Sequence, residues 1–322
     1  MRKKILVTGG AGFIGSNFIR YILNKYPDCR IVNLDKLTYA GCRANLKDIE
    51  NNPRYEFVKG DICDAKIVGK IVKECDTIIN FAAESHVDRS IKDAGIFIKT
   101  NVFGTHALLE AAKDNKISLF CQISTDEVFG SREKGFFKET DLLKPSSPYS
   151  ASKAAADHLA HSYYVTYSLP VVIARPTNNF GPFQYPEKVI PLFITNALEG
   201  KKLPVYGDGQ NVRDWIYVLD NCAAIELIIH KGKVGKIYNV AGNNEMKNID
   251  LTRLILKIMG KSEDLIEFVQ DRPGHDRRYA LDSTKINNLG WKPQHNFEQA
   301  LRETIEWYRK NQNWWQPLKT GF

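Results

Sequence analysis

The chain has 322 residues, of which 43% are hydrophobic and 25% charged, and these values are typical of a globular protein. No stretch approaches the ~20 apolar residues of a membrane span, and the apolar run after the basic start is too short for a signal sequence. The formal net charge is +8, but the basic residues are dispersed, which argues against a nucleic-acid partner. We therefore expect a cytoplasmic protein with no membrane association.

The six cysteines show no C-x-x-C spacing, and no histidines are paired at the intervals of a metal site. Thiols of cytoplasmic proteins are normally kept reduced. The sequence therefore predicts free cysteines, with neither disulfides nor a metal site.

Short apolar runs alternate with helical patterns through the first half of the chain, which is typical of repeated strand–helix units. The expected strands are Lys4–Thr8, Arg30–Leu34, Tyr55–Lys59, Thr77–Phe81, Leu119–Ser124 and Pro170–Ala174. Helices are expected at Phe13–Tyr26, Ile96–Asp114, Pro148–Tyr167 (with Ser147 as N-cap) and Phe297–Lys310. These elements predict the α/β class, with a Rossmann-type, doubly wound parallel sheet and a smaller mixed α/β C-terminal lobe.

A glycine-rich turn follows the first strand directly and opens a helix, with Gly9, Gly12 and Gly15 at its key positions. Glycines at this spacing allow a tight turn, close approach of a pyrophosphate and close packing of the helix on the sheet. Asp35 ends the second strand 20 residues after Gly15. A carboxylate there accepts hydrogen bonds from the ribose hydroxyls and repels a 2′-phosphate. The pattern predicts NAD rather than NADP, although Lys36 weakens that preference.

Tyr149 and Lys153 stand at i and i+4 near the start of a helix, so they share one helical face. The lysine ammonium, together with the positive nicotinamide ring of NAD⁺, is expected to lower the pKa of Tyr149 from ~10. The resulting phenolate can take a proton from a sugar hydroxyl while its carbon yields hydride.

Asp126 and Glu127 follow the fifth strand, where repulsion between adjacent carboxylates favours one protonated acid and one ionised base. An elimination needs this division, because one group removes a carbon-bound proton and the other protonates the departing hydroxyl. Residues 81–88, after the fourth strand, are expected to line cofactor and sugar, although His86 alone is equally typical of a structural histidine. Asp61 and Ile62, after the third strand, are expected to contact adenine.

These features resemble the extended short-chain dehydrogenase/reductase superfamily and, more narrowly, its dTDP-glucose 4,6-dehydratases. The resemblance runs nearly end to end and includes D-K-L-T-Y-A-G at 35–41, A-A-E-S-H-V-D-R-S at 82–90, T-D-E-V-F-G at 125–130, P-E-K-V-I-P-L at 186–192, R-D-W-I-Y at 213–217 and R-P-G-H-D-R-R-Y at 272–279. The Thr-Asp-Glu triplet is the narrowest of these motifs. Epimerases of the superfamily usually lack its Asp-Glu pair, and GDP-mannose dehydratases usually show Thr-Ser-Glu.

The resemblance implies the roles of five catalytic residues. Tyr149, assisted by Lys153 and Thr125, deprotonates the 4-hydroxyl of dTDP-glucose while C4 gives hydride to NAD⁺. Glu127 then removes the C5 proton, Asp126 protonates the leaving 6-hydroxyl, and hydride returns to C6. The implied product is dTDP-4-keto-6-deoxyglucose, and NAD is not consumed.

The resemblance also implies binding residues, domains and assembly. The NAD-binding residues are Gly9, Gly12, Phe13, Ile14, Gly15, Asp35, Lys36, Asp61, Ile62, Ala82, Ala83, Tyr149, Lys153 and Asn178. The substrate-binding residues are Ser85, His86, Asn179, Glu187, Lys188, Arg213, Asn248 and His275, with Arg213 the strongest candidate for the diphosphate. Residues 1–176, joined by 212–240, are expected to form the NAD-binding domain, and 177–211 with 241–322 the nucleotide-sugar lobe. The helices at 96–114 and 148–167 match the pair that forms homodimers in the family.

Three other interpretations stay open at this stage. A UDP- or CDP-glucose 4,6-dehydratase differs only in the base, and a pocket gains only ~1–3 kcal/mol from one methyl group. A UDP-sugar 4-epimerase uses the same scaffold, but it needs no acid for a leaving hydroxyl. A non-catalytic NAD-binding protein is disfavoured because all five catalytic residues are present.

Overall fold

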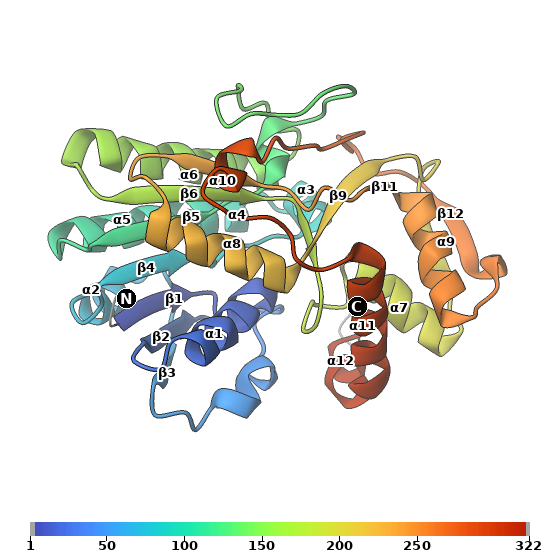
Figure 1. Ribbon diagram of the computed structural model, residues 1–322, viewed down its shortest axis with the longest axis horizontal. Helices are drawn as coiled ribbons and strands as arrows, with labels where there is room; N and C mark the ends of the chain where they lie inside the picture. Colours follow the sequence, from blue (N-terminus) through green and yellow to red (C-terminus); the bar gives the residue numbers. More distant parts are fainter. Residues whose placement is uncertain (1–3, 320–322) are drawn as a thin grey trace.

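A seven-stranded parallel sheet lies at the centre of the structure, a computed structural model that describes residues 4–319 (Figure 1). The strand order is β10-β6-β5-β4-β1-β2-β3, so the chain winds outward in both directions from the β1–β4 junction. Open sheets of this topology bind ligands beyond the carboxyl ends of their strands at such a switch point. The strands are β1 (Lys4–Thr8), β2 (Arg30–Asp35), β3 (Tyr55–Lys59), β4 (Thr77–Asn80), β5 (Leu119–Ile123), β6 (Val171–Pro176) and β10 (Ile237–Val240).

Helices cover both faces of this sheet, and the central strands are accordingly buried runs of apolar residues. On one face α1 (Phe13–Lys25) packs against α8 (Val218–Lys231); on the other, α5 (Thr105–Asp114) packs between α2 (Ala65–Val72) and α6 (Pro148–Tyr167). A capping box between Ser147 and Ser150, followed by Pro148, starts α6 where the sequence predicts it. The Rossmann-type fold is therefore confirmed.

The continuous helix expected over Ile96–Asp114 is wrong in detail. A short helix, α4 (Gly95–Phe97), leads into a π-helical segment, η2 (Ile98–Gly104), before α5 begins. Within η2 the side chain of Asn101 pairs with both the N–H and the carbonyl of Glu84, and it donates to Ser152 Oγ at 2.8 Å. These tertiary hydrogen bonds offer a physical reason for the wider turn, since hydrophobic periodicity does not distinguish it from an α-helix.

A smaller lobe lies beside the carboxyl ends of the strands (Figure 1). It contains a three-stranded sheet, β11 (Glu245–Lys247), β9 (Val212–Tyr217) and β7 (Asn178–Phe180), and a pair formed by β12 (Ile266–Val269) and β8 (Leu203–Tyr206). Its helices are α7 (Val189–Glu199), α9 (Asn248–Met259), α11 (Phe297–Lys310) and α12 (Gln312–Lys319). Short helices complete the fold: η1 (Arg43–Ile49), α3 (Val87–Lys92), η3 (Asp126–Phe129), η4 (Glu263–Leu265) and α10 (Thr284–Asn287). After β9 the chain returns through α8 to β10, the strand that completes the large sheet beside β6.

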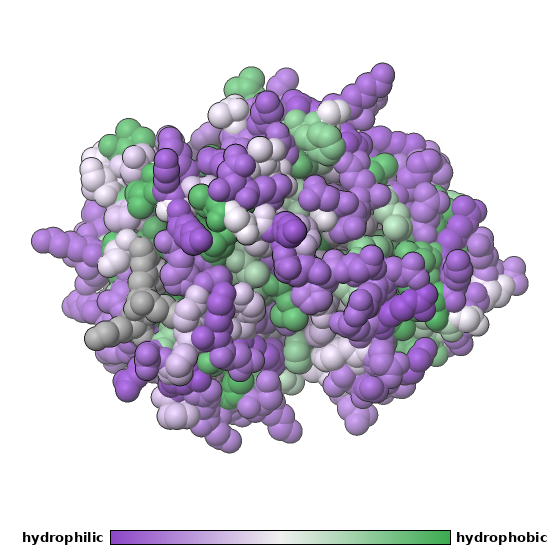
Figure 2. Space-filling view, viewed as in Figure 1, coloured by the Kyte–Doolittle hydropathy of each residue, from purple (hydrophilic) through white to green (hydrophobic). Residues whose placement is uncertain are grey.

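One large apolar cluster runs from the α1–α8 face of the sheet into the smaller lobe, so the two parts share a core. The face in Figure 2 is mainly hydrophilic, with apolar side chains in small groups. Within residues 4–319, none of the helices is long and apolar enough to cross a membrane.

Candidate active site

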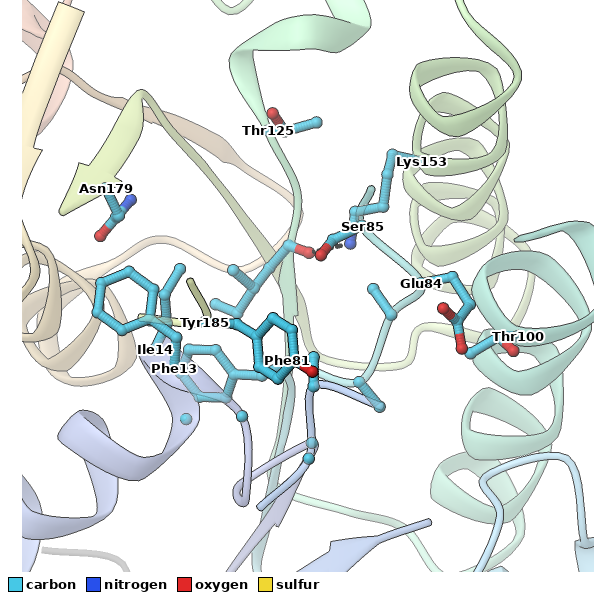
Figure 3. A pocket seen from close by; sticks show the side chains of 18 of the residues that line it. Phe13, Ile14, Phe81, Glu84, Ser85, Thr100, Thr125, Lys153, Asn179 and Tyr185 are labelled. Carbon is cyan, nitrogen blue, oxygen red and sulfur yellow. Dashed lines mark hydrogen bonds between the residues drawn. The ribbon is translucent and has the colours of Figure 1, made fainter. Parts of the chain in front are cut away.

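Two adjoining cavities, of about 300 and 470 Å³, open where the strands of the large sheet meet the smaller lobe. The first extends from the glycine-rich turn to the start of α6, and the second continues into the smaller lobe. They share a wall formed by Glu127, Asn178, Asn179, Gln184, Glu187 and Lys188. Figure 3 shows a pocket from close by, where the side chains of Thr125, Lys153, Ser85 and Asn179 project from different parts of the chain.

The glycine-rich turn leaves no room for side chains at two of its predicted positions. A Cβ on Gly9 would lie 2.6 Å from the backbone nitrogen of Ala82, and one on Gly15 would lie 2.5 Å from the carbonyl oxygen of Gly9. Gly9 also has a φ of +68°, which disfavours other residues. The turn is stabilised by Asn45, whose side-chain amide donates a hydrogen bond to the carbonyl of Ala11 at 2.8 Å. The backbone and the start of α1 are thus presented directly to the cavity.

Asp35 is buried at the end of β2, beside this turn. Its Oδ2 accepts from the Ala11 N–H at 2.9 Å and its Oδ1 from the Leu37 N–H at 2.8 Å, which fixes the carboxylate while each oxygen keeps a further lone pair. Lys36 forms an ion pair with Asp61 at 2.8 Å. The charge of Lys36 is therefore partly neutralised by Asp61. Lys36 attracts a 2′-phosphate less than the sequence suggests, so the preference for NAD over NADP is better preserved.

Tyr149 and Lys153 enter the first cavity from one face of α6. Lys153 Nζ donates to the carbonyl of Ile123 at 2.6 Å, and burial lowers the pKa of this lysine to about 8. Burial, followed by the charge of Glu127, raises the pKa of Tyr149 well above its usual range, with Thr125 opposing the rise. The expected lowering of the tyrosine pKa relies on the charge of bound NAD⁺ as well as on Lys153, and in this chain alone burial raises that pKa instead.

The carboxyl groups of Asp126 and Glu127 differ in their surroundings: Asp126 is buried, whereas Glu127 is half-buried and lines both cavities. Burial and the neighbouring Glu127 raise the pKa of Asp126 well above its usual value, and its Oδ1 accepts from Thr125 Oγ1 at 3.1 Å. Burial also raises the pKa of Glu127, but three cations of the second cavity oppose the rise: Arg272, Arg213 and Lys188. The arrangement favours a protonated Asp126 beside an ionised Glu127.

The segment after β4 contributes to both cavities, in keeping with the expectation that it lines cofactor and sugar. Ala82, Ala83 and Ser85 line the first cavity, and His86 lines the second. His86 accepts from the N–H of Arg89 at 3.4 Å as the cap of α3, and burial lowers its pKa to about 4. It is therefore neutral at pH 7 and has a structural contact in addition to its place at the cavity.

The second cavity gathers basic side chains from distant parts of the chain. Arg213 donates to the carbonyl of Asp276 at 2.9 Å, with its guanidinium 4.3 Å from the Tyr279 ring centroid. Lys188 donates to the carbonyl of Ser85 at 2.8 Å, and burial lowers its pKa. His275 is hydrogen-bonded to Asp271 at 2.6 Å. Arg213 and Lys188, together with Arg272, form a cluster of cations that favours a polyanionic ligand such as a diphosphate.

Every residue that the sequence predicts for the site lines one of these cavities. The NAD set lies in the first cavity, and Asn248, Arg213 and His275 lie in the second. Sequence reasoning missed several lining residues: Thr100, Gln184, Tyr185, Trp215, Arg272 and Tyr279. Of these, Arg272 and Tyr279 begin and end the R-P-G-H-D-R-R-Y motif around His275, and this was the available signal.

Comparison with known proteins agrees with this geometry. Residues 6–304 match the family model described as GDP-mannose 4,6 dehydratase. The chain is 54% identical to the low-salt glycan biosynthesis protein Agl12 of Haloferax volcanii, over 94% of this chain and 98% of that protein. It is 49% identical to a dTDP-glucose 4,6-dehydratase of Streptomyces niveus, over 98% and 96% of the two chains.

The structure superposes with a TM-score of 0.96 on DesIV, a dTDP-glucose 4,6-dehydratase of Streptomyces venezuelae solved with NAD bound. The two chains are 49% identical, and the superposition covers 98% of this chain and 99% of that chain. Together, the site and these similarities show that the chain belongs to the nucleotide-sugar 4,6-dehydratase family, among the dTDP-glucose 4,6-dehydratases.

Proposed function

We propose that this chain is a hydro-lyase that converts dTDP-glucose into dTDP-4-keto-6-deoxyglucose with NAD as a retained cofactor. The observation that carries the proposal is the placement of the Thr-Asp-Glu triplet. Thr125, Asp126 and Glu127 line the same cavity as Tyr149 and Lys153, and Glu127 also lines the cation-rich second cavity. One cavity therefore contains groups for both oxidation and elimination.

The residues of the first cavity fit NAD. The crowded positions of Gly9 and Gly15 let backbone approach a pyrophosphate at the start of α1. Asp35, fixed by two backbone N–H groups, keeps acceptor capacity for the ribose hydroxyls. NAD held there by these residues would supply the hydride chemistry, as the acceptor for the hydride of C4 and the donor of hydride to C6.

The first proton transfer belongs to Tyr149. As hydride leaves C4, the Tyr149 phenolate takes the proton of the 4-hydroxyl and becomes a neutral phenol. Before that transfer, the Lys153 ammonium, the Thr125 hydroxyl and the positive ring of bound NAD⁺ would hold the tyrosine in its phenolate form. Because burial lowers the pKa of Lys153 to about 8, the proton of its ammonium is readily exchanged near neutral pH.

The elimination belongs to the adjacent acids. The new 4-ketone acidifies the C5 proton, which Glu127 removes as the base. Asp126, whose pKa is raised by burial, gives its proton to the 6-hydroxyl, which leaves as water. Proton return to C5 completes the reaction. The nucleotide lies in the second cavity, with Arg213, Lys188 and Arg272 toward the diphosphate and the shared wall beside the sugar.

The test is to incubate purified protein with dTDP-glucose and, in parallel, with UDP-glucose, adding no NAD. Product is identified by the mass loss of one water and by the alkali-induced absorbance of the 4-keto sugar. We expect product from dTDP-glucose alone, which also requires that NAD is retained through purification.

Other outcomes would select the alternatives. Equal rates with UDP-glucose would contradict the thymidine preference and favour a dehydratase tolerant of either base, with CDP-glucose tested next. Loss of C4 configuration without loss of water would favour a UDP-sugar 4-epimerase. Absence of any turnover with NAD supplied would contradict dehydration of these sugars and leave a non-catalytic NAD-binding protein to be considered.

We also propose that the protein is a cytoplasmic homodimer, with residues 1–176 and 212–240 as its NAD-binding domain. Apolar side chains exposed near the π-helical segment and α6 support the dimer: Ile98, Phe103, Val165 and Tyr167 are each more than half exposed. The free state of all six cysteines is compatible with a reducing compartment. Size-exclusion chromatography with light scattering tests the assembly.

A further inference from the structure

Asp157 and Arg175 form a buried ion pair next to the catalytic residues, and the proposed mechanism does not use it. Asp157 lies on α6 one turn beyond Lys153, and Arg175 lies on β6. Arg175 Nε donates to Asp157 Oδ2 at 2.9 Å, and the two side chains are only 3% and 2% exposed. Removing two charges from water generally costs more than their attraction returns, so stability alone is a poor account of this pair.

The pair connects three elements that carry catalytic groups. Asp157 Oδ2 also accepts from Ser124 Oγ at 2.9 Å, and Ser124 immediately precedes the Thr-Asp-Glu triplet. The Arg175 guanidinium lies 4.9 Å from the ring centroid of Phe129, the last residue of the short helix η3 that holds both acids. Asp157 itself belongs to the helix of Tyr149 and Lys153.

We propose that Asp157 and Arg175 are positioning residues that fix the Thr-Asp-Glu triplet against the tyrosine–lysine pair, so that oxidation at C4 and elimination at C5–C6 occur in one bound pose. This inference rests on the proposed function and deepens it. Its physical basis is the sensitivity of proton transfer to geometry, since a displacement of ~1 Å can cost ~100-fold in rate.

Asp157 also influences the charge on Lys153. Burial lowers the pKa of Lys153, and the Asp157 carboxylate opposes that effect. Without this carboxylate, the pKa of Lys153 falls further and the ammonium loses its proton at a lower pH. Ionisable groups that line the same cavity as Lys153 include Tyr149 on α6, Asp126 and Glu127 on η3, and Glu84 after β4. Arg175 lies on the neighbouring strand β6, and the other ionisable residues of α6, from His158 to Tyr167, follow beyond Asp157 on the helix.

The experiment compares wild type, D157N and R175M across a range of pH with dTDP-glucose as substrate. Both variants are expected to lose at least about tenfold in kcat while KM changes less than about threefold. In D157N the alkaline limb of the kcat profile should move to lower pH. In R175M, where η3 loses its support, elimination should slow more than oxidation, so the absorbance of reduced nicotinamide should accumulate during turnover.

E226Q is the matched control, because Glu226 is another buried carboxylate with polar partners, Lys25 and His230, away from the catalytic elements. It should lower the melting temperature without moving the pH profile. The proposal is overturned if D157N keeps the wild-type profile, or if all three variants lose activity only in proportion to their loss of stability. If R175M does not fold, R175K replaces it; it keeps the charge but loses the planar fork, and wild-type kcat there would contradict positioning by Arg175.

The wild-type arm separates this inference from the proposed function. If wild type forms no product from dTDP-glucose, the proposed function fails. The electrostatic part is then tested by NMR titration of isotopically labelled lysine in wild type and D157N. An unchanged Lys153 pKa would refute that part, and a lower value in D157N would support it.

Discussion

At the scale of single residues, the site depends on how protein surroundings separate two neighbouring carboxyl groups. Asp126 is fully enclosed and held by Thr125, whereas Glu127 faces the cations of the second cavity. In the proposed mechanism, two chemically similar acids therefore have opposite tasks. The sequence indicates that such a division exists at this pair, but the assignment of each role requires the contacts of the folded chain.

The division of roles predicts different failures for the two conservative amides. In deuterium oxide, E127Q should lose deuterium exchange at C5 because no base removes that proton, and product formation should fall by ~100-fold or more. D126N should retain C5 exchange while losing water elimination. Mass spectrometry and NMR of the recovered sugar distinguish these results. Identical behaviour of the two variants would contradict separate roles.

The raised pKa of Asp126 also predicts a gain in stability for D126N. The folded state holds a proton that the unfolded chain releases near its ordinary pKa of 3.8, so wild-type stability is lost as pH rises from there toward the folded pKa. An amide has no such dependence. We expect D126N to exceed wild type in free energy of unfolding at pH 7, with little difference near pH 4. Urea denaturation at both pH values measures this, and a difference independent of pH would contradict the cause given.

The pKa of a buried side chain and the partner of a buried charge could not be predicted from the sequence. The spacing of Tyr149 and Lys153 predicts a shared helical face correctly. The predicted lowering of the tyrosine pKa also relies on the charge of bound NAD⁺, and in this chain alone burial raises that pKa. Asp157 and Arg175 have no distinctive spacing, and charged residues are normally expected at the surface. Only the fold shows that both are enclosed and face each other.

At the scale of secondary-structure elements, the glycine-rich turn is the feature on which the proposed NAD binding depends most directly. Its strand, turn and helix are readable from sequence because each has its own residue requirements. The crowding that makes glycine necessary at positions 9 and 15 becomes visible only when β4 and the turn pack together.

Gly15→Ala should therefore release the cofactor. Its Cβ would overlap the backbone of Gly9 and Gly10, at 2.5 and 2.8 Å, and push the turn into the phosphate position. We expect the purified variant to contain little or no NAD, as measured by release on denaturation and chromatography. G69A is the matched control, since a Cβ there meets nothing within 4 Å on α2 and should stabilise that helix by up to about 1 kcal/mol. A G15A protein with full NAD content would contradict the role of the turn.

The remaining elements show where pattern reasoning succeeds and where it stops. The strands of the first half, α6 and α11 lie within two residues of their expected bounds, because apolar periodicity and capping residues are local signals. The π-helical segment is missed because Asn101 shapes it through contacts with Glu84 and Ser152, which lie 17 and 51 residues away in sequence.

At the scale of the whole molecule, the C-terminal helix α12 connects the smaller lobe to the glycine-rich turn. Trp314 Nε1 donates to Asn45 Oδ1 at 2.8 Å, and the Asn45 side chain in turn holds the carbonyl of Ala11. The Trp314 ring also contacts Trp307 and Phe183. A residue near the end of the chain thus supports a loop near its beginning.

W314F should weaken this support while keeping an aromatic ring. Because Asn45 is buried, loss of its partner is expected to cost about 1–3 kcal/mol of stability, and bound NAD should be lost faster on dialysis. W307F, which changes the same aromatic cluster without removing the bond to Asn45, should lower stability and retain NAD. Equal NAD retention by W314F and wild type would show that the Trp314–Asn45 hydrogen bond does not influence NAD binding at the glycine-rich turn.

The wall shared by the two cavities has a thermodynamic consequence. Glu187 and Lys188 face both chambers, so a ligand that orders their side chains from one side prepares them for a ligand on the other. Any such heterotropic cooperativity must be reciprocal: the factor by which a nucleotide-sugar tightens the dinucleotide equals the factor by which the dinucleotide tightens the nucleotide-sugar. Titration calorimetry around the closed cycle of four species would yield that single coupling constant from either direction.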